Sequence, residues 1–332
     1  MSNIIDYVSW RGDLDFTASP FNEVDSLILT QLVYLDFRGI VPGIHSRSSV
    51  TLEKAAEEYF AGHSNRTEES GGQLLKDCRM VLKAVMGTER FKNCRLSRYI
   101  EDISEEKEYQ FSAVKIVPED GSIYISFSGT DSSLAGWKEN FNMSYLARTP
   151  GQERAVQYVQ KVLETGRKPV CLGGHSKGGN LAVYAAIKGG KHIQNRLRAV
   201  YNFDGPGFNE DMVKQEEYQN ILPKLHTLIP QSSVIGMLLE HEEDYTVVES
   251  TEKGLLQHRA LSWKVMGSHF VYSKGLSQSS IFWNETLKQW IAGMEKQEKK
   301  EFVDALFEVI ETAGIKAVSY THLRAHETRG NL

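Results

Sequence analysis

A serine between two glycines is the segment of this chain with the clearest capacity for chemistry. Residues 174–178 read Gly-His-Ser-Lys-Gly and fit the pattern G-x-S-x-G, in which a strand turns sharply into a helix and presents a serine hydroxyl. The apolar run 169–173 precedes the pattern and a helical stretch of small residues follows it. Glycine relieves the crowding inside such a turn. We therefore predict that Ser176 is a nucleophile; the alternative is an ordinary glycine-rich turn between a strand and a helix.

Attack by a serine on an acyl carbon builds negative charge on the carbonyl oxygen, and that charge needs hydrogen-bond donors. The helix expected after Ser176 begins at Lys177, where the backbone N–H and the helix dipole favour an anion. A second donor must come from a neighbouring strand end. Residues 127–131, Phe-Ser-Gly-Thr-Asp, end an expected strand. We assign the oxyanion hole to the N–H groups of Thr130 and Lys177; for 127–131 a plain β-turn is the alternative.

Histidine is the side chain best suited to accept the proton of a serine nucleophile. In α/β-hydrolases the order along the chain is serine, acid, histidine. His258 lies in a late, loop-like stretch at residues 254–263 and is our candidate base, with His269 as its main rival. His241 lies in an acidic run, for which we expect solvent exposure. The other histidines between the serine and residue 270 are His192 and His226.

An acidic partner would hold the histidine in the correct tautomer and stabilise its protonated form. Asp204 directly follows the apolar run 197–203 and precedes a Gly-Pro-Gly turn. It should therefore project at the C-terminal edge of the sheet, where the serine turn also lies. The alternative role of Asp204 is that of an Asx-turn cap. Asp244 is the second candidate for the acid.

The elements that must position these residues alternate in type along the chain. Two strands come first and should pair antiparallel, because a glycine turn separates them. Strands and helices then alternate with short links, which favours parallel strands joined by right-handed crossovers. The expected strands are 111–117, 122–128, 169–173 and 197–203, and the expected helices are 154–165 and 178–189. This pattern predicts an α/β fold of the α/β-hydrolase type, with a mostly parallel sheet flanked by helices.

The first third of the chain is expected to be mainly helical. Apolar residues recur at helical spacing in residues 23–37, 52–62 and 72–86. None of these stretches carries recognisable site chemistry, so we expect them to cap or cover the sheet. We accordingly divide the chain into a helical N-terminal region at 1–105 and a hydrolase core at 106–317.

Residues 318–332 look like one reading frame of a transposase adapter used in DNA-library preparation. We therefore expect the native sequence to be interrupted near Ala317 and the tail to be an artefact without function. The two histidines of the tail, His322 and His326, are for that reason left out of the candidate site.

The composition narrows the class of function. A net charge of −5 over 332 residues disfavours general nucleic-acid binding, which needs a basic face. Three scattered cysteines indicate neither a disulfide framework nor a metal site. Together with an N-terminus that does not resemble a secretory signal, they indicate a cytoplasmic protein. No apolar run approaches the ~20 residues of a membrane span, and no metal or organic cofactor is implied.

Three segments resemble the class 3 lipases, namely residues 127–131, 136–140 and 174–179. In that family they form an oxyanion turn, a following Trp helix and a G-H-S-x-G-G elbow. The turn at 204–208 is similar to the acid turn of pancreatic-type lipases. The chain also looks, over nearly its whole length, like an uncharacterised bacterial family of lipase-like proteins, on the evidence of residues 6–13, 20–25 and 174–180. The resemblance implies a hydrolase fold and a serine nucleophile, and no particular substrate.

The chain departs from the class 3 lipase pattern in ways that bear on the site. The residue types differ from the common ones at Ser128, Asn140 and Lys177. After residues 225–230, where those lipases place their acid, this chain has Gln-Ser-Ser, which is why we assign the acid to Asp204. The segment 131–137 is shorter than a typical lipase lid and disfavours interfacial activation.

Together these residues predict a serine hydrolase that cleaves carboxylic esters of lipid or acyl type with a triad of Ser176, Asp204 and His258. The expected partner is a small-molecule ester or a lipid. Two alternatives stay open. One is a catalytically silent hydrolase-fold module for binding or regulation, since fold does not fix function. The other is an acyltransferase or thioesterase that uses the same triad.

Overall fold

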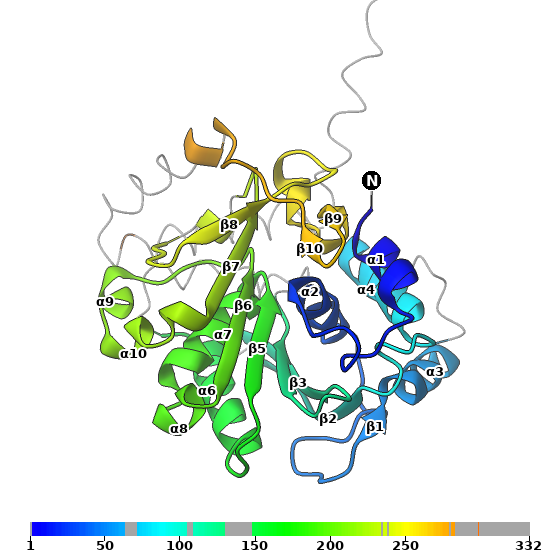
Figure 1. Ribbon diagram of the computed structural model, residues 1–332. Coiled ribbons are helices and arrows are strands. Elements are labelled where there is room, and N and C mark those ends of the chain that lie inside the picture. The colour runs from blue at the N-terminus through cyan, green and yellow to red at the C-terminus, as the bar shows by residue number, and fades with distance from the viewer. Residues whose placement is uncertain are drawn as a thin grey trace, which may run out of the picture.

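The computed structural model describes residues 2–63, 72–104, 109–129 and 148–282, apart from 234, 238 and 279, and also residue 298. An eight-stranded sheet with its strands in chain order forms the centre of this part of the molecule (Figure 1). The strands are β1 (Val50–Thr51), β2 (Arg95–Ser104), β3 (Tyr109–Val117), β4 (Ile123–Phe127), β5 (Val170–His175), β6 (Leu197–Phe203), β7 (Leu225–Pro230) and β8 (Tyr245–Val248). The pairs from β1 to β4 are antiparallel and those from β4 to β8 are parallel. The fold is therefore the α/β-hydrolase type that the sequence predicts.

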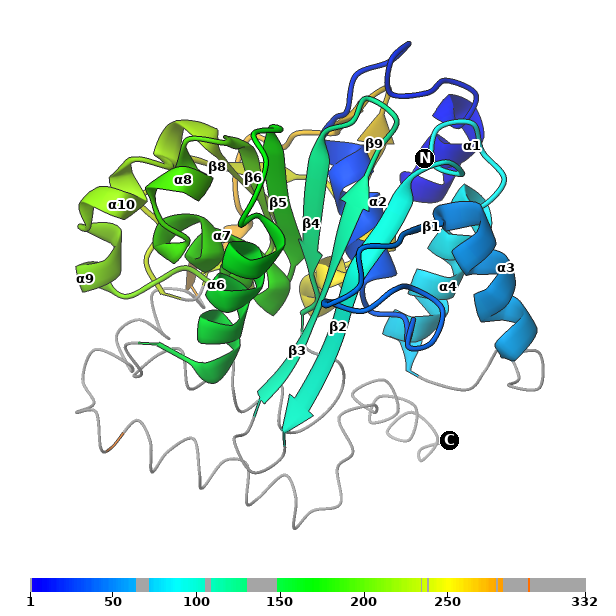
Figure 2. The same cartoon turned by 90° about the horizontal axis from the view of Figure 1, so that it is seen from below.

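Helices cover both faces of the sheet (Figure 2). On one face α6 (Pro150–Val162) and α7 (Lys177–Lys188) pack against each other and against the central strands. On the other face α2 (Glu23–Leu32) packs against β5, with α4 (Gln73–Val85) beside it. The other helices in the described part of the chain are α1 (Ile4–Arg11), α3 (Leu52–Gly62), α8 (Lys191–Gln194), α9 (Glu210–Val213) and α10 (Glu216–Gln219), with the short 3-10 helices η1 (Leu222–Lys224), η2 (Ile235–Met237), η3 (Gly254–His258) and η4 (Ala260–Ser262).

Burial on both faces explains why the central strands are continuous apolar runs. All five residues of β4 are buried. Tyr124 packs in the core on the side of α2, where its hydroxyl lies 2.7 Å from that of Ser26. Ile125 and Phe127 belong to the core on the side of α6 and α7. The parallel strands are thereby held rigidly at the edge where Ser176 and Asp204 lie.

Two of the differences between the structure and the expected elements in the N-terminal third concern α2 and β2. The helix expected at residues 23–37 ends at Leu32, where the chain turns. Leu35 lies in the following loop but is also buried, so apolar residues continue at helical spacing beyond the end of the helix. Strand β2 was not expected at all. Its pairing register shifts between Ser97 and Ile100, and Arg98 adopts a φ of +58°. This bulge interrupts the alternation by which a strand is recognised in a sequence.

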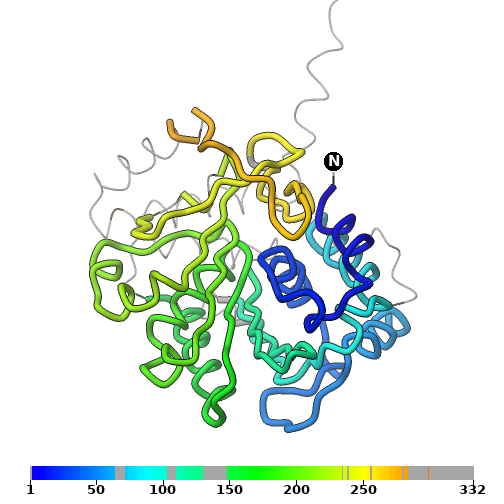
Figure 3. The backbone as a smooth tube through the Cα atoms, in the orientation of Figure 1, coloured from blue at the N-terminus to red at the C-terminus, as the bar shows by residue number. Residues whose placement is uncertain are grey.

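The N-terminal helices lie against the late segment that follows β8 (Figure 3). This segment contains a two-stranded sheet of β9 (Val265–Met266) and β10 (His269–Phe270). The N–H of Val265 donates to the carbonyl oxygen of Ser2 at 2.9 Å, and the N–H of Phe270 donates to Glu23 Oε1 at 2.9 Å. No helix in the described ranges combines the length and the apolar character needed to cross a bilayer.

Candidate active site

Ser176 occupies a strained turn between β5 and α7. Its φ of +58° and ψ of −135° lie where L-residues are rare, at a cost of about 1–3 kcal/mol. A Cβ atom at position 174 would come within 2.1 Å of the main chain of Gly178. A Cβ atom at position 178 would in turn lie 2.2 Å from the carbonyl oxygen of Phe127. Both glycines are therefore required by the close packing, and the turn has the geometry of a nucleophile elbow.

Asp204 and His258 are in direct contact. His258 Nδ1 lies 2.6 Å from Asp204 Oδ2. Asp204 directly follows β6 with a φ of +52°, and its N–H donates to the carbonyl oxygen of Leu228 at 2.8 Å. The aspartate side chain is buried, whereas 29% of the histidine side chain is exposed. A carboxylate on Nδ1 leaves Nε2 of the same ring for a proton from another group.

The Asp204 carboxylate is bound at its other oxygen as well. Oδ1 accepts hydrogen bonds from the Ser233 hydroxyl and, at 3.2 Å, from the N–H of Gly236. A buried carboxylate is stable as an anion when donors satisfy its oxygens. Ser233 follows β7 in the segment where the class 3 lipases place their acid. Sequence reasoning found no role for Ser233, because nothing in the sequence shows which neighbour its hydroxyl contacts.

Ser176 and His258, the candidate nucleophile and base, are not hydrogen-bonded to each other in the described part of the chain. Among the described residues, Ser176 Oγ makes no hydrogen bond with His258 Nε2. In hydrolases without substrate this contact is often long and tightens when the substrate binds. The Ser176 N–H donates to the carbonyl oxygen of Phe203 at 2.8 Å, so the serine turn is fixed to the strand that ends at Asp204.

One of the two expected oxyanion donors lies in the described part of the chain. Lys177 is the first residue of α7, as expected, and its side chain is fully buried, with Nζ donating to the carbonyl oxygen of Gln110 at 2.7 Å. Thr130 lies outside the described residues, as do the segment 131–137 and Asn140. Gly129 is described, and a Cβ atom there would lie 3.0 Å from Ser176 Cβ. The end of the β4 segment therefore approaches the serine closely.

Asn180 joins α7 to the turn that follows Asp204. Its amide nitrogen donates to the carbonyl oxygens of Pro206 and Gly207 at 3.0 and 2.9 Å. Its amide oxygen accepts from Gln152 of α6 at 2.8 Å. The position of Asp204 relative to Ser176 is consequently set by side-chain bonds as well as by the strands.

The other candidate residues lie elsewhere. His269 is exposed on β10, and Asp244 is exposed before β8. The expectation that His241 is solvated was wrong, because only 7% of its side chain is exposed and its Nδ1 lies 3.0 Å from Glu243 Oε1. Burial acts to raise the pKa of Glu243, but hydrogen bonds from His241 and from two hydroxyl groups outweigh burial and lower that pKa. The two hydroxyl groups belong to Tyr218 and Thr227. The acidic run at residues 240–244 thus contains a buried, hydrogen-bonded cluster around Glu243.

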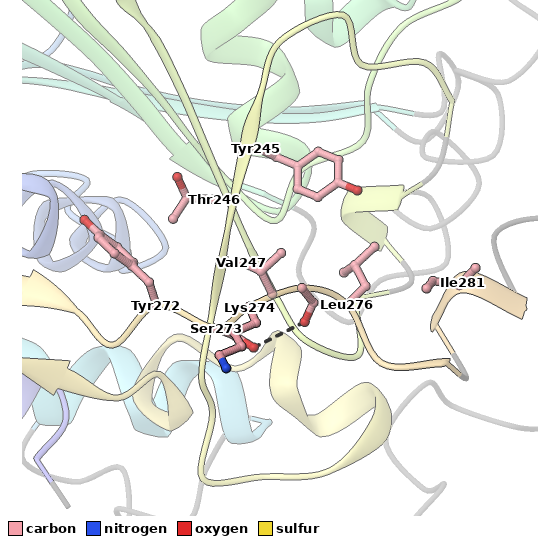
Figure 4. A pocket seen from close by; sticks show the side chains of 9 residues that line it. Tyr245, Thr246, Val247, Tyr272, Ser273, Lys274, Leu276 and Ile281 are labelled. Carbon is pink, nitrogen blue, oxygen red and sulfur yellow. Dashed lines mark hydrogen bonds between the residues drawn. The ribbon is translucent and has the colours of Figure 1, made fainter.

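A pocket of about 610 Å³ lies along β8 (Figure 4). Tyr245 and Val247 line it from the strand, and Tyr272 and Leu276 line it from the later segment. Ser176, Asp204 and His258 are not among its lining residues. The described residues also contain no cluster of three histidine, cysteine, aspartate or glutamate side chains that could hold a metal ion.

Comparison with known proteins finds a family model and solved lipase structures that are similar to this chain. Residues 85–308 match the model of a family described as Mbeg1-like. The solved structure of M37 lipase is similar with 15% identity and a TM-score of 0.39, over 64% of this chain and 68% of that one. The native lipase–propeptide complex of Rhizomucor miehei is similar with 15% identity and a TM-score of 0.37, over 52% of this chain and 59% of that one. None of the curated proteins matches this sequence.

Proposed function

The chain belongs to the Mbeg1-like family, a lipase-like family, and on that premise we propose that it is a serine hydrolase that cleaves carboxylic esters. In this proposal Ser176 is the nucleophile, His258 the general base and Asp204 the residue that orients the base. The substrate is a lipid or another acyl ester small enough to reach the serine. The observation that carries the proposal is the 2.6 Å contact between His258 Nδ1 and Asp204 Oδ2, beside a serine in the strained elbow conformation.

The proposed reaction proceeds in two halves. Ser176 Oγ attacks the acyl carbon while His258 Nε2 takes the hydroxyl proton, and a tetrahedral oxyanion forms. The oxyanion receives hydrogen bonds from the N–H groups of Thr130 and Lys177. Collapse of the intermediate expels the alcohol, which takes the proton from His258, and leaves an acyl-serine. Water then repeats the sequence, and the acid is released with the serine restored.

Asp204 contributes through the histidine. A charged aspartate on Nδ1 keeps Nε2 free to accept a proton and stabilises the imidazolium that forms in the transition state. The donors from Ser233 and Gly236 hold the carboxylate in place during both halves. An acceptor other than water at the acyl-serine stage would make the same site an acyltransferase, and a thiol leaving group would make it a thioesterase.

Reaction with a fluorophosphonate probe tests the proposal, because the probe phosphonylates a serine only when a base activates it. We expect the wild-type chain to be labelled at Ser176 and to hydrolyse p-nitrophenyl esters. Ser176→Ala should abolish labelling and lower the rate by about three to six orders of magnitude. Ser9→Ala, a change at an exposed serine of α1, is the matched control and should behave as wild type.

Two results would contradict the proposal. A wild-type chain that is folded but neither labelled nor active would favour a silent binding module. A Ser176→Ala variant that keeps wild-type activity would show that another residue is the nucleophile. Acyl transfer is recognised by adding an alcohol acceptor and measuring the new ester beside the free acid.

A further inference from the structure

His175, the last residue of β5, contacts the candidate base directly. His175 is 3% exposed. Its Nε2 lies 2.8 Å from the main-chain carbonyl oxygen of His258. The two imidazole rings lie side by side, with centroids 4.6 Å apart and planes inclined by 33°. The residue before the nucleophile is thus bonded to the backbone of the residue that would accept the nucleophile's proton.

The hydrogen bond fixes the tautomer of His175. A carbonyl oxygen can only accept, so His175 Nε2 carries a hydrogen, and in the neutral ring Nδ1 then carries none. Tyr34 faces that side of the residue, with its hydroxyl 3.4 Å from Nδ1 and donating to the His175 carbonyl oxygen at 3.0 Å. Burial, followed by the neighbouring His258, lowers the pKa of His175 to about 3. The ring is therefore neutral at ordinary pH and adds no second positive charge when His258 becomes protonated.

His258 is held at both its ring and its backbone. Asp204 binds the ring at Nδ1, and His175 binds the main-chain carbonyl oxygen. A bond to the ring alone would let the residue pivot about Asp204, so that Nε2 could move without breaking that bond. The preceding residue, Gln257, is anchored separately, since its carbonyl oxygen accepts from Trp263 Nε1 at 2.9 Å and its Oε1 accepts from the N–H of Ser232 at 2.8 Å.

From this geometry we infer that His175 is a positioning residue, which holds the backbone of His258 so that the Nε2 of the base faces Ser176. The effect of His175 on rate rests on the proposed function, whereas its effect on the orientation of His258 does not. His175 touches neither the substrate nor the reacting atoms in this role. Its contribution is made through the single donor at Nε2.

Two amide substitutions at position 175 distinguish the effect of the hydrogen-bond donor from the effects of side-chain polarity and packing. The amide nitrogen of Gln lies near the position of His Nε2, whereas the shorter Asn places its nitrogen nearer to Nδ1 and cannot reach the carbonyl oxygen of His258. We expect His175→Asn to lower kcat by about 10- to 100-fold with little change in KM, because a misplacement of about 1 Å has an effect of that size. His175→Gln should recover most of this loss. His269→Gln, at an exposed histidine, is the control for the chemical change itself.

A spectroscopic measurement tests the inference independently of activity. In protein labelled with 15N-histidine, the proton shared between His258 Nδ1 and Asp204 should give a strongly downfield resonance in the wild type. The resonance should persist in His175→Gln and in His269→Gln, and broaden or disappear in His175→Asn. Asp204→Asn identifies the signal by removing it.

The outcomes separate the two proposals. If the wild type is inert but His175→Asn loses the resonance that His175→Gln and His269→Gln keep, the proposed hydrolase function fails and the positioning role stands. If His175→Asn keeps both the resonance and the activity of His269→Gln, the positioning role is overturned. Should His175→Asn not fold, His175→Gln decides the matter. A folded His175→Gln within about tenfold of wild type supports the role, and a loss of about 100-fold with the resonance absent overturns it.

Discussion

At the scale of single residues, the acid of the candidate triad lies one strand earlier than in the class 3 lipases that the sequence resembles. Asp204 follows β6, and the position after β7 is occupied by Ser233, whose hydroxyl donates to Asp204. The ends of β6 and β7 are neighbours, so a carboxylate on either could approach the same histidine. The hydroxyl of Ser233, after β7, thus stabilises the carboxylate of Asp204, after β6.

Asp204→Asn should lower kcat by about four orders of magnitude, because an amide neither holds the tautomer of His258 nor stabilises its protonated form. Asp244→Asn is the matched change at an exposed aspartate and should leave kcat nearly unchanged. Steady-state ester hydrolysis checks both variants once circular dichroism shows them folded. A large loss in Asp244→Asn together with an active Asp204→Asn would move the acid to the later segment.

Ser233→Ala should lower kcat by about tenfold, since a hydrogen bond to a charged group contributes about 1.5–3 kcal/mol and part of that is recovered from the Gly236 N–H. Ser232→Ala removes a neighbouring hydroxyl that contacts Ser277 instead of Asp204, and it should keep the wild-type rate. Equal rates in the two variants would mean that Ser233 does not orient the acid.

At the scale of elements, the N-terminal helices are joined through one buried ion pair. Asp25 of α2 accepts hydrogen bonds from Arg90 and, at 2.9 Å, from the Tyr7 hydroxyl of α1. Asn22, the N-cap of α2, donates to the same hydroxyl at 2.8 Å. Tyr7, Asn22 and Asp25 all lie in the segments 6–13 and 20–25, on which the likeness to a bacterial lipase-like family partly rests. Those segments therefore encode packing among α1, α2 and the loop that carries Arg90.

Asp25→Asn should lower the free energy of unfolding by about 3–5 kcal/mol, because it leaves the buried Arg90 guanidinium without its counter-charge. Asp6→Asn changes a capping aspartate on the surface of α1 and should cost at most about 1 kcal/mol. Urea unfolding followed by circular dichroism measures both values. A loss in Asp25→Asn no larger than that in Asp6→Asn would show that the ion pair has little weight in the fold.

At the scale of the whole molecule, the fold class could be predicted from the sequence, and so could part of the candidate site. Apolar runs that alternate with helical spacing predicted the parallel sheet, because strands buried on both faces need such runs. Ser176, Asp204 and His258 stood out by residue type and by their places at strand ends or loops. Ser233, His175 and Asn180 did not, since each acts through a contact between segments that are distant in the sequence.

The stability of the molecule should fall on acidification partly because of His175. Its folded pKa is about 3, while its usual value is 6.5. Between these values the unfolded chain binds a proton that the folded chain does not, so stability is lost as pH falls. Relative to His175→Gln, the wild type should lose about 3 kcal/mol more between pH 7 and pH 4, at 1.36 kcal/mol for each pH unit below 6.5. Parallel urea titrations at the two pH values check this, and equal losses would mean that the ring is protonated in the folded state.

The contacts that join residues 2–23 to the segment 265–270 have a consequence for the order of folding. Ser2 and Val265 are 263 positions apart, and Glu23 and Phe270 are 247 apart. Contacts of such separation form late, because closing the intervening loop costs entropy before any contact compensates for it. The turn at Ser176 is built from β4, β5, β6 and α7, which all lie within residues 123–203. The late segment that carries His258, β9 and β10 is instead closed against the N-terminal helices. We therefore expect a chain emerging from the ribosome to form the turn at Ser176 early and to place His258, the proposed proton acceptor, late.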